Sequence, residues 1–184
     1  MRRNLFITLI AITGMAITMA ACGAIGVTGS GGGDVFFYSE EGFTMSDTGE
    51  ICHYLEAAPY DVARNITWAS SDYYNTDIAG TDTAIGTGRK NTALILATDA
   101  NAPAARACKD YRGGGKSDWF LPSKDELNLL YENRAVAGSM KIRCYWSSSQ
   151  YDTNSAWNQN FYDGYQYLFN FKHYDYGVRA IRAF

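Results

Sequence analysis

The sequence predicts an α+β domain built on an antiparallel sheet with short helices. Residues that favour β-strands gather towards both ends of the chain, at 34–38, at 51–55 and from 145 onward. Between these regions, residues 90–131 are rich in Ala and Leu, which favour helices. If strands from both ends pair in one sheet, the two ends of the domain lie close together.

The first strands are expected at 34–38 and 51–55, where Val, Ile, Phe and Tyr are frequent. Residues 39–50 are rich in Ser, Glu, Gly and Asp and are expected to form the turn between them. A further edge segment is expected at 65–68. Residues 70–88 contain few large apolar side chains and are expected to form a long loop.

Three short helices are expected in the middle of the chain. The first two span 90–97 and 104–111 and are separated by Asn101-Ala-Pro103, and Gly113-Gly-Gly115 follows as a stop signal. The third begins after Pro122, because Ser123 is a good N-cap and Glu126, three residues on, completes a capping box. Its apolar face is expected to hold Leu127, Leu130 and Tyr131.

The segment 151–176 consists almost entirely of Tyr, Asn, Asp, Phe, Ser and Thr. Large, rigid Tyr side chains combined with small polar ones are typical of antibody-like binding surfaces. An aromatic-rich β-sheet core is the alternative interpretation. In a strand over 156–162, alternation would place one set of side chains in the core and the other towards a ligand. The expected core set is Trp157, Gln159 and Phe161, and the expected ligand-facing set is Asn158, Asn160 and Tyr162.

Residues 1–21 have the pattern of a bacterial export signal, with Arg2 and Arg3 before a short apolar stretch. Met19-Ala20-Ala21-Cys22 resembles the lipobox of bacterial lipoproteins, which implies cleavage before Cys22 and attachment of lipid to its sulfur. An ordinary secretory signal is the alternative. Residues 22–33 are expected to be a flexible Gly/Ser tether, and residues 34–184 are expected to form one domain.

The charge and the motifs exclude several functions. The formal net charge is −3, and loss of Arg2 and Arg3 makes it more negative, so no nucleic-acid partner is expected. His53 and His173 are the only histidines, so an HExxH zinc helix is impossible. The run 112–117 ends like a phosphate-binding loop but lacks its strand–loop–helix context. No catalytic residue, metal or cofactor is therefore expected.

Three cysteines remain besides Cys22, at Cys52, Cys108 and Cys144. Their spacing matches no zinc pattern, and three cysteines cannot all pair within one chain. Core packing is the simpler interpretation, because free Cys is among the most buried residue types. One disulfide between two of them is the alternative, with no pair favoured.

Segments 54–59, 83–92, 113–127 and 145–184 together resemble one bacterial family. The most specific are Gly113-Gly-Gly-Lys-Ser-Asp-Trp-Phe-Leu-Pro-Ser-Lys-Asp-Glu-Leu127 and the last segment, which begins Tyr145-Trp-Ser-Ser-Ser149 and ends Val178-Arg-Ala-Ile-Arg-Ala-Phe184. The family is named for the C-terminal domain of collagen-like Lcl adhesins, and the segments resemble in particular the retroelement-diversified variable lipoproteins of the treponemal type. It implies a C-type-lectin-like fold, as in formylglycine-generating enzymes, and a ligand-binding face near the C-terminus.

In such retroelement systems adenines are replaced, so AAY asparagine codons can become many residue types but never Lys, Gln, Glu, Met or Trp. Within 151–176, only Trp157, Gln159, Gln166 and Lys172 are of those types. The sequence therefore predicts a variable surface over about 150–176. The residues expected to bind ligand are Tyr151, Asp152, Thr153, Asn154, Ser155, Asn158, Asn160, Tyr162, Asp163, Tyr165, Tyr167, Leu168, Phe169, Asn170, Phe171, His173, Tyr174, Asp175 and Tyr176.

Taken together, these features predict a lipid-anchored binding protein without catalytic activity, displayed on the outer surface of a bacterial cell envelope. Its expected partners are a protein or glycan on the C-terminal face and the membrane, through lipid on Cys22. The alternatives are a structural envelope lipoprotein whose aromatic tail is core, and an enzyme related to formylglycine-generating enzymes. Exposure of the tail's aromatic side chains separates the first alternative from a binding face.

Overall fold

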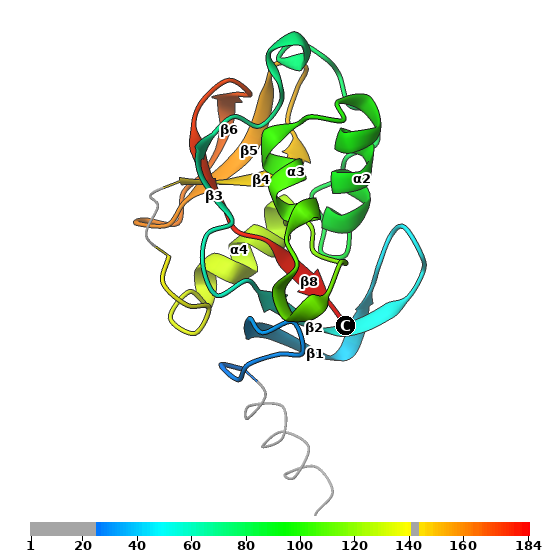
Figure 1. Ribbon diagram of the computed structural model, residues 1–184, viewed down its shortest axis with the longest axis vertical. Helices are drawn as coiled ribbons and strands as arrows, with labels where there is room; N and C mark the ends of the chain where they lie inside the picture. Colours follow the sequence, from blue (N-terminus) through cyan, green and yellow to red (C-terminus); the bar gives the residue numbers. More distant parts are fainter. Residues whose placement is uncertain (1–24, 141–143) are drawn as a thin grey trace, which may run out of the picture.

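The computed structural model describes residues 25–140 and 144–184, and this part of the chain folds as an α+β domain. Its strands form a three-stranded sheet in the order β1-β2-β8 and a five-stranded sheet in the order β3-β7-β4-β5-β6. The small sheet lies at the end where the chain enters the domain, and β5 and β6 lie at the opposite end (Figure 1). The predicted α+β class is therefore confirmed.

The small sheet joins the two ends of the chain. β1 (Asp34–Thr44) and β8 (Ile181–Ala183) pair antiparallel with opposite edges of β2 (Ile51–Ala57). The backbone N–H of Tyr54 donates to the carbonyl of Phe184 at 2.9 Å. The termini of the domain are close together, as expected.

The large sheet carries the C-terminal segment. It consists of β3 (Ala63–Ile66), β4 (Cys144–Gln150), β5 (Ser155–Asn160), β6 (Gln166–Phe171) and β7 (Tyr176–Val178). The pairs β4–β5, β5–β6 and β3–β7 are antiparallel, whereas β4 and β7 are parallel. The sheet is thus mixed rather than purely antiparallel, and β6 forms one of its edges.

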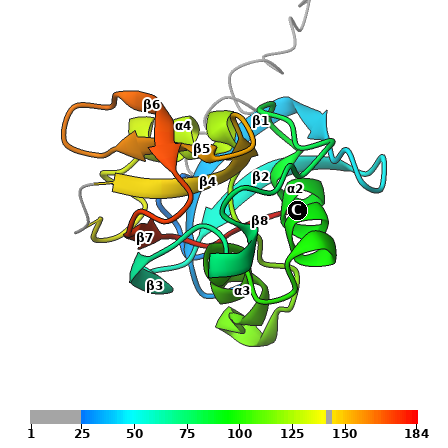
Figure 2. The same ribbon diagram turned by 90° about the horizontal axis from the view of Figure 1, so that it is seen from above.

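The three predicted helices are present. α2 (Gly88–Thr98) and α3 (Pro103–Asp110) pack together on one side of the domain, and α2 also contacts β4. α4 (Lys124–Glu132) lies between the two sheets and contacts β1, β4 and β5 (Figure 2). Its capping box is formed: Ser123 Oγ accepts from the N–H of Glu126, and the Glu126 carboxylate accepts from the N–H of Ser123. Short 3₁₀ turns occur at Ser71–Tyr73 and Gly113–Gly115.

Two buried clusters form the core. One, next to α2 and α3, is centred on Trp68, Trp119 and Trp146, and the other contains Phe36 and Tyr145. Each large apolar side chain in them contributes about 1.5–3 kcal/mol through burial. Of the residues predicted to face the core, Leu127, Leu130 and Phe161 are buried. Trp119, Leu121, Trp146, Val178 and Ile181 are buried with them.

The cysteines of the described chain support the core interpretation. Cys52 and Cys108 are free, buried thiols in different core clusters, and burial raises the pKa of both. Cys144 lies at the start of β4 and is half-buried. None of the helices in 25–140 or 144–184 is both long and apolar enough to cross a bilayer.

The expected flexible tether is wrong for residues 25–33, which fold against the domain. The N–H groups of Gly31 and Gly33 donate to the buried carboxylate of Glu56, at 3.2 and 2.7 Å. A Cβ on Gly33 would lie 2.0 Å from the Ala57 carbonyl oxygen, so this glycine permits close packing of the backbone rather than flexibility. Cys22 lies outside the described residues.

Candidate ligand-binding face

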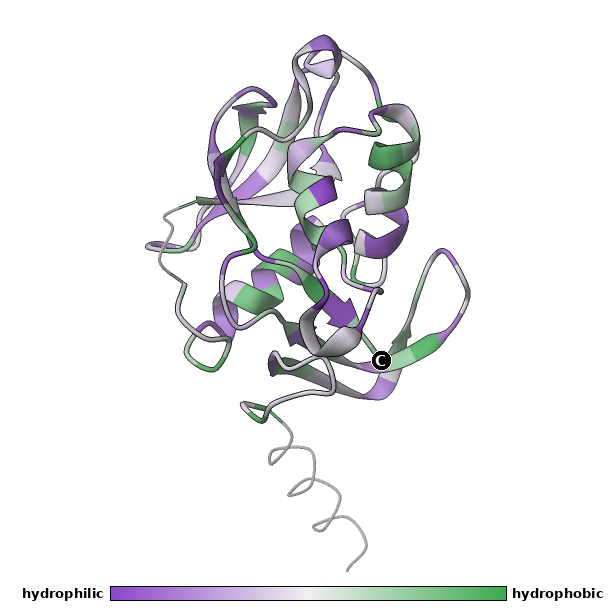
Figure 3. Ribbon diagram, in the orientation of Figure 1, coloured by the Kyte–Doolittle hydropathy of each residue, from purple (hydrophilic) through white to green (hydrophobic). Residues whose placement is uncertain are grey.

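Seven aromatic side chains are exposed at the end of the domain formed by β5, β6 and their turns. Tyr162 is 81% exposed and Phe169 is 71% exposed. Figure 3 shows hydrophobic residues on β6 at this end of the molecule. We call this surface the aromatic face, and its members are Tyr151, Tyr162, Tyr165, Tyr167, Phe169, Phe171 and Tyr174.

Exposed aromatic rings occupy alternate positions of β6, although its pairing with β5 is irregular between Tyr167 and Asn170. Gln166, Leu168 and Asn170 are half-buried, whereas the three aromatic residues between and after them, Tyr167, Phe169 and Phe171, are exposed. Because β6 is an edge strand, nothing in the described chain pairs with its outer side. A cluster of exposed aromatics adds no stability in water and is typical of a binding surface.

The exposed rings contact one another. Tyr165 and Tyr167 have ring centroids 4.7 Å apart, and Tyr151 meets Phe169 edge-on at 5.4 Å. Phe171 stacks on His173 at 5.4 Å. Such contacts restrict the rotamers before a ligand arrives, which lowers the entropy lost on binding.

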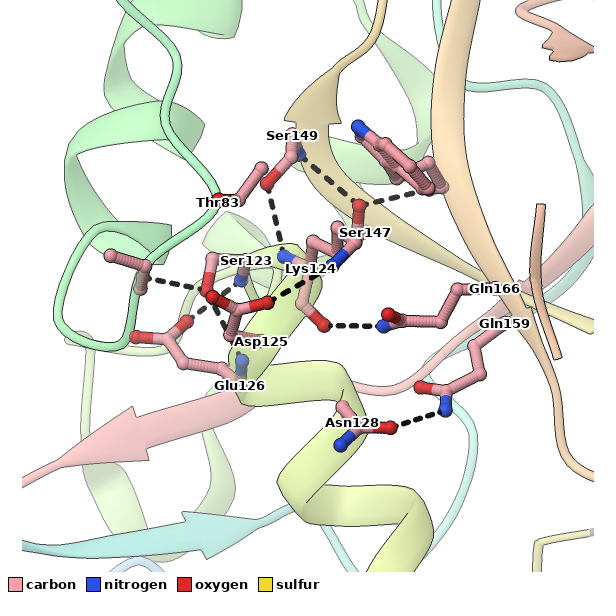
Figure 4. A network of polar contacts seen from close by, with 12 residues as sticks. Thr83, Ser123, Lys124, Asp125, Glu126, Asn128, Ser147, Ser149, Gln159 and Gln166 are labelled. Atoms are coloured by element: carbon pink, nitrogen blue, oxygen red, sulfur yellow. Dashed lines mark hydrogen bonds and ion pairs between the residues drawn. The ribbon is translucent and has the colours of Figure 1, made fainter. Parts of the chain in front are cut away.

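Two glutamines tie the aromatic face to α4. Gln159 donates from Nε2 to Asn128 Oδ1 at 2.8 Å, and Gln166 donates from Nε2 to the Lys124 carbonyl at 2.9 Å (Figure 4). The Lys124 ammonium also lies 5.0 Å from the centre of the Trp157 ring, within the range of a cation–π contact. These contacts hold β5 and β6 on the capped, rigid end of α4.

Lys172 ties the other end of β6 to the domain. Its buried ammonium donates to the carbonyls of Thr76 and Thr153, at 2.7 and 2.8 Å, and to Gln150 Oε1 at 2.7 Å. It lies 4.9 Å from the centre of the Trp68 ring. Burial lowers the pKa of Lys172 from its usual 10.5 to about 8.

The structure places most of the sequence-predicted site residues at this end of the domain and on the surface. In addition to the seven aromatics, the exposed ones are Asp152, Thr153, Asn154, Asp163, His173 and Asp175. Leu168, Asn170 and Tyr176 are half-buried, and Tyr176 packs on Trp146 at 4.7 Å.

The predicted division of β5 into a core face and a ligand face is wrong in part. Ser155, Asn158 and Asn160 are buried, so they do not belong to the exposed surface. Trp157, expected in the core, is only half-buried. β5 lies between β4 and β6, and side chains on both of its faces are covered, so alternation did not separate inside from outside.

A cavity of about 360 Å³ opens beside the aromatic face. Small-molecule sites commonly have volumes of about 300–1,000 Å³. Cys144 was not expected here, although it pairs with Asn160 across β4 and β5 and therefore points to the same side of the sheet. The lining residues are Cys144, Asn160, Asp163, Tyr167, Asn170 and Tyr176.

A second cavity of about 330 Å³ lies beside α2 and α3. Its principal charged groups are already paired. Arg89 Nε lies 2.7 Å from Asp47, and Asp118 lies 2.9 Å from Arg182. These pairings lower the pKa of both carboxyl groups against the opposing effect of burial. Paired charges of this kind stabilise the fold, and the aromatic face is the stronger candidate site.

Among the described residues, no group of three His, Cys, Asp or Glu side chains is placed to hold a metal ion. The polar groups around the first cavity are amides, phenols and one carboxylate. Such groups donate and accept hydrogen bonds, and together with the rings they are suited to recognising a ligand.

The family model of the Lcl C-terminal domain matches residues 57–182. The chain therefore belongs to this family, and the membership suggests a surface or lipoprotein-like role. The match includes α2, α3, α4 and the strands β3 to β7, and hence the aromatic face. No curated protein matches the chain significantly.

Proposed function

We propose that this protein is a lipid-anchored, non-catalytic binding protein of the bacterial cell surface whose aromatic face binds a ligand. The observation that carries the proposal is the exposure of seven large aromatic side chains on one end of a well-packed domain. Aromatic side chains commonly dominate the energy of binding interfaces. The face lies at the opposite end of the domain from the chain entry (Figure 1), which suits a protein anchored through lipid on Cys22.

The contacts of four residues support diversification of this face by a retroelement. Trp157, Gln159, Gln166 and Lys172 are the only residues in 151–176 that cannot arise from AAY codons. All four contact the remainder of the domain, through α4 in three cases and through Thr76 and Trp68 in the case of Lys172. We propose that they are the fixed supports of a segment whose other positions vary.

We also propose that the fold is of the C-type-lectin-like kind. The pairing of β8 with β2, which closes the chain ends into one sheet, supports this assignment. So does the position of α4 between this sheet and the strands that carry the aromatic face.

Two alternatives fit the structure less well. A structural lipoprotein with an aromatic core would bury its tail, yet Phe169 is 71% exposed. An enzyme related to formylglycine-generating enzymes requires paired cysteines, and Cys52 and Cys108 lie in different core clusters.

The test is a full-length variant in which Tyr165, Phe169 and Tyr174 are replaced by Ala. Cells displaying the protein are assayed for adhesion to immobilised glycans and extracellular-matrix proteins. Each truncation of an anchor costs about 2 kcal/mol, so binding falls by more than tenfold. The melting temperature stays nearly unchanged, because the three rings are exposed.

Tyr60→Ala is the matched control, since Tyr60 is 58% exposed but lies outside the aromatic face. This variant retains adhesion. Unfolding of the triple variant would support an aromatic core instead, and loss of adhesion with EDTA alone would support a metal-dependent lectin.

A further inference from the structure

Asn158 is a buried side chain whose polar atoms have no partner. It is 1% exposed, and neither Oδ1 nor Nδ2 forms a hydrogen bond within the described part of the chain. Burying such a group without a partner costs about 1–3 kcal/mol. Buried polar groups are nearly always satisfied, so this exception calls for an explanation.

The sheet register places Asn158 next to residues that line the 360 Å³ cavity, although Asn158 is not itself a lining residue. Asn158 pairs with Tyr167 on one side and with Trp146 on the other, and it is two residues from Asn160 on the same face of β5. Tyr167 and Asn160 both line the cavity, and so does Tyr176, whose ring packs on Trp146. The residues around Asn158 are thus the walls of the cavity.

Tyr167, the cross-strand partner of Asn158, lines the cavity. It is 37% exposed and belongs to the edge strand β6, so its side chain has room to turn outward. That rotation would open the cavity floor and present the Asn158 amide to a ligand.

The charges around the cavity restrict the ligand. None of the six described lining residues is Lys or Arg, so these residues offer no cationic group to sulfate, phosphate or carboxylate. Asp163 is the one acidic residue, and its carboxylate already accepts from the N–H of Tyr165 at 3.0 Å and from Asn160 Nδ2 at 3.3 Å. A neutral ligand fits best.

The remaining groups favour a sugar ring over a peptide. Asn158 and Asn170 offer amides that can both donate and accept, as adjacent hydroxyls of a sugar require. The rings of Tyr167 and Tyr176 offer apolar faces for the C–H groups of the same sugar. A peptide would instead find the unpaired backbone of the β6 edge.

We propose that this cavity binds one neutral sugar residue of a glycan, with Asn158 as the hydrogen-bonding group at its floor. The inference rests on the proposed function and gives the ligand its chemical class. The exposed rings of the aromatic face would then contact neighbouring sugar residues.

The experiment uses the full chain in detergent micelles on an array of neutral, sialylated and sulfated glycans. The test variant is Asn158→Leu, which keeps the size of the side chain and removes the unsatisfied amide. Its affinity for neutral glycans falls at least tenfold, while its melting temperature rises by about 2–4 °C or more. Asn101→Leu, at an exposed asparagine between α2 and α3 and outside the aromatic face, is the matched control and keeps wild-type binding.

Three results would overturn the inference. One is binding of the wild type only to charged glycans or to none, and another is wild-type affinity in Asn158→Leu. The third is a lower melting temperature in Asn158→Leu, which would show that the amide is satisfied within the fold. If the triple aromatic variant loses adhesion in any of these cases, the proposed function stands and only the sugar assignment fails.

Discussion

Lys172 shows how one side chain can hold a segment that is otherwise free to change. Its ammonium reaches the 70–88 loop through Thr76, the end of β4 through Gln150 and the β4–β5 turn through Thr153. Three separate parts of the backbone therefore meet at one buried charge. Removal of that charge should affect stability more than the loss of any exposed aromatic ring.

We predict that Lys172→Met lowers the free energy of unfolding by about 2–4 kcal/mol at pH 7, because three acceptors lose a charged donor. Relative to Lys172→Met, the wild type should also gain stability from pH 8 to 10. The pKa of Lys172 is about 8 in the folded state and 10.5 when unfolded, so in this range the unfolded chain binds more protons. Urea denaturation at pH 7, 8, 9 and 10 measures both effects. A wild-type stability that falls over this range as steeply as that of Lys172→Met would contradict the prediction.

At single positions, the sequence predicted which residues differ in role better than which side chains face the solvent. The four residues excluded by the codon argument all contact other elements, because their long side chains reach donors, acceptors and rings there. Asn158 and Asn160 were expected to face a ligand and are buried. A two-residue alternation shows which side chains share a face, but the neighbouring strands decide whether that face is covered.

At the scale of elements, α4 contacts the strands that carry the aromatic face, and its N-terminus is fixed by the capping box. Glu126 is fully buried there, and its carboxylate accepts from the N–H groups of Ser123 and Gly86, at 2.7 and 2.8 Å. Burial raises the pKa of Glu126 from 4.5 to about 7, against the opposing effect of these donors. The capping box therefore carries an ionisable group that titrates near neutral pH.

We predict that the stability contributed by Glu126 is fully present below pH 4.5 and is lost as the pH rises through 7. The folded chain binds the proton more tightly than the unfolded chain, so ionisation favours unfolding. Glu126→Gln has no proton to lose and should show a smaller fall in unfolding free energy between pH 5 and 8. Chemical denaturation at these two pH values is the measurement, and Asp125→Asn, at the more exposed neighbour, is the control. Equal slopes in wild type and Glu126→Gln would refute the assignment.

Elements with strong local signals were predicted well, and those defined by pairing were not. The cap at Ser123 and the glycines after α3 located the helices within a few residues. β1 extends to Thr44, beyond the expected end at 38, because Phe43 and Thr44 pair with Cys52 and Ile51 despite the polar residues before them. The local sequence favours a turn there, and the partner strand overrides it.

At the scale of the whole molecule, the ordered segment 25–33 changes how the domain relates to a membrane anchor. Its glycines were interpreted as a sign of flexibility, whereas Gly31 and Gly33 pack on Glu56 and on the backbone of β2. Only residues 22–24 then separate a lipid on Cys22 from the folded part, a reach of about 10 Å even when fully extended. The domain would lie close to the bilayer, with the aromatic face at its far end (Figure 1).

We predict that anchoring and folding can be separated by two substitutions, one at Cys22 before this segment and one at Gly33 at its end. Cys22→Ser removes the sulfur that would carry the lipid and leaves the described contacts intact. It should abolish incorporation of labelled fatty acid and leave the protein soluble or as an unprocessed precursor. Its melting temperature should not change.

Gly33→Ala should have the opposite effect, because its new Cβ would lie 2.0 Å from the Ala57 carbonyl oxygen, and the segment must shift away from Glu56. The melting temperature falls while membrane fractionation and lipid labelling persist. Gly49→Ala is the control, since no atom lies within 4 Å of its Cβ position and it bears only the strain of a positive φ, about 1 kcal/mol. If Cys22→Ser fractionates and labels like the wild type, the lipid anchor is wrong. If Gly33→Ala is no less stable than Gly49→Ala, the segment 25–33 does not belong to the folded domain.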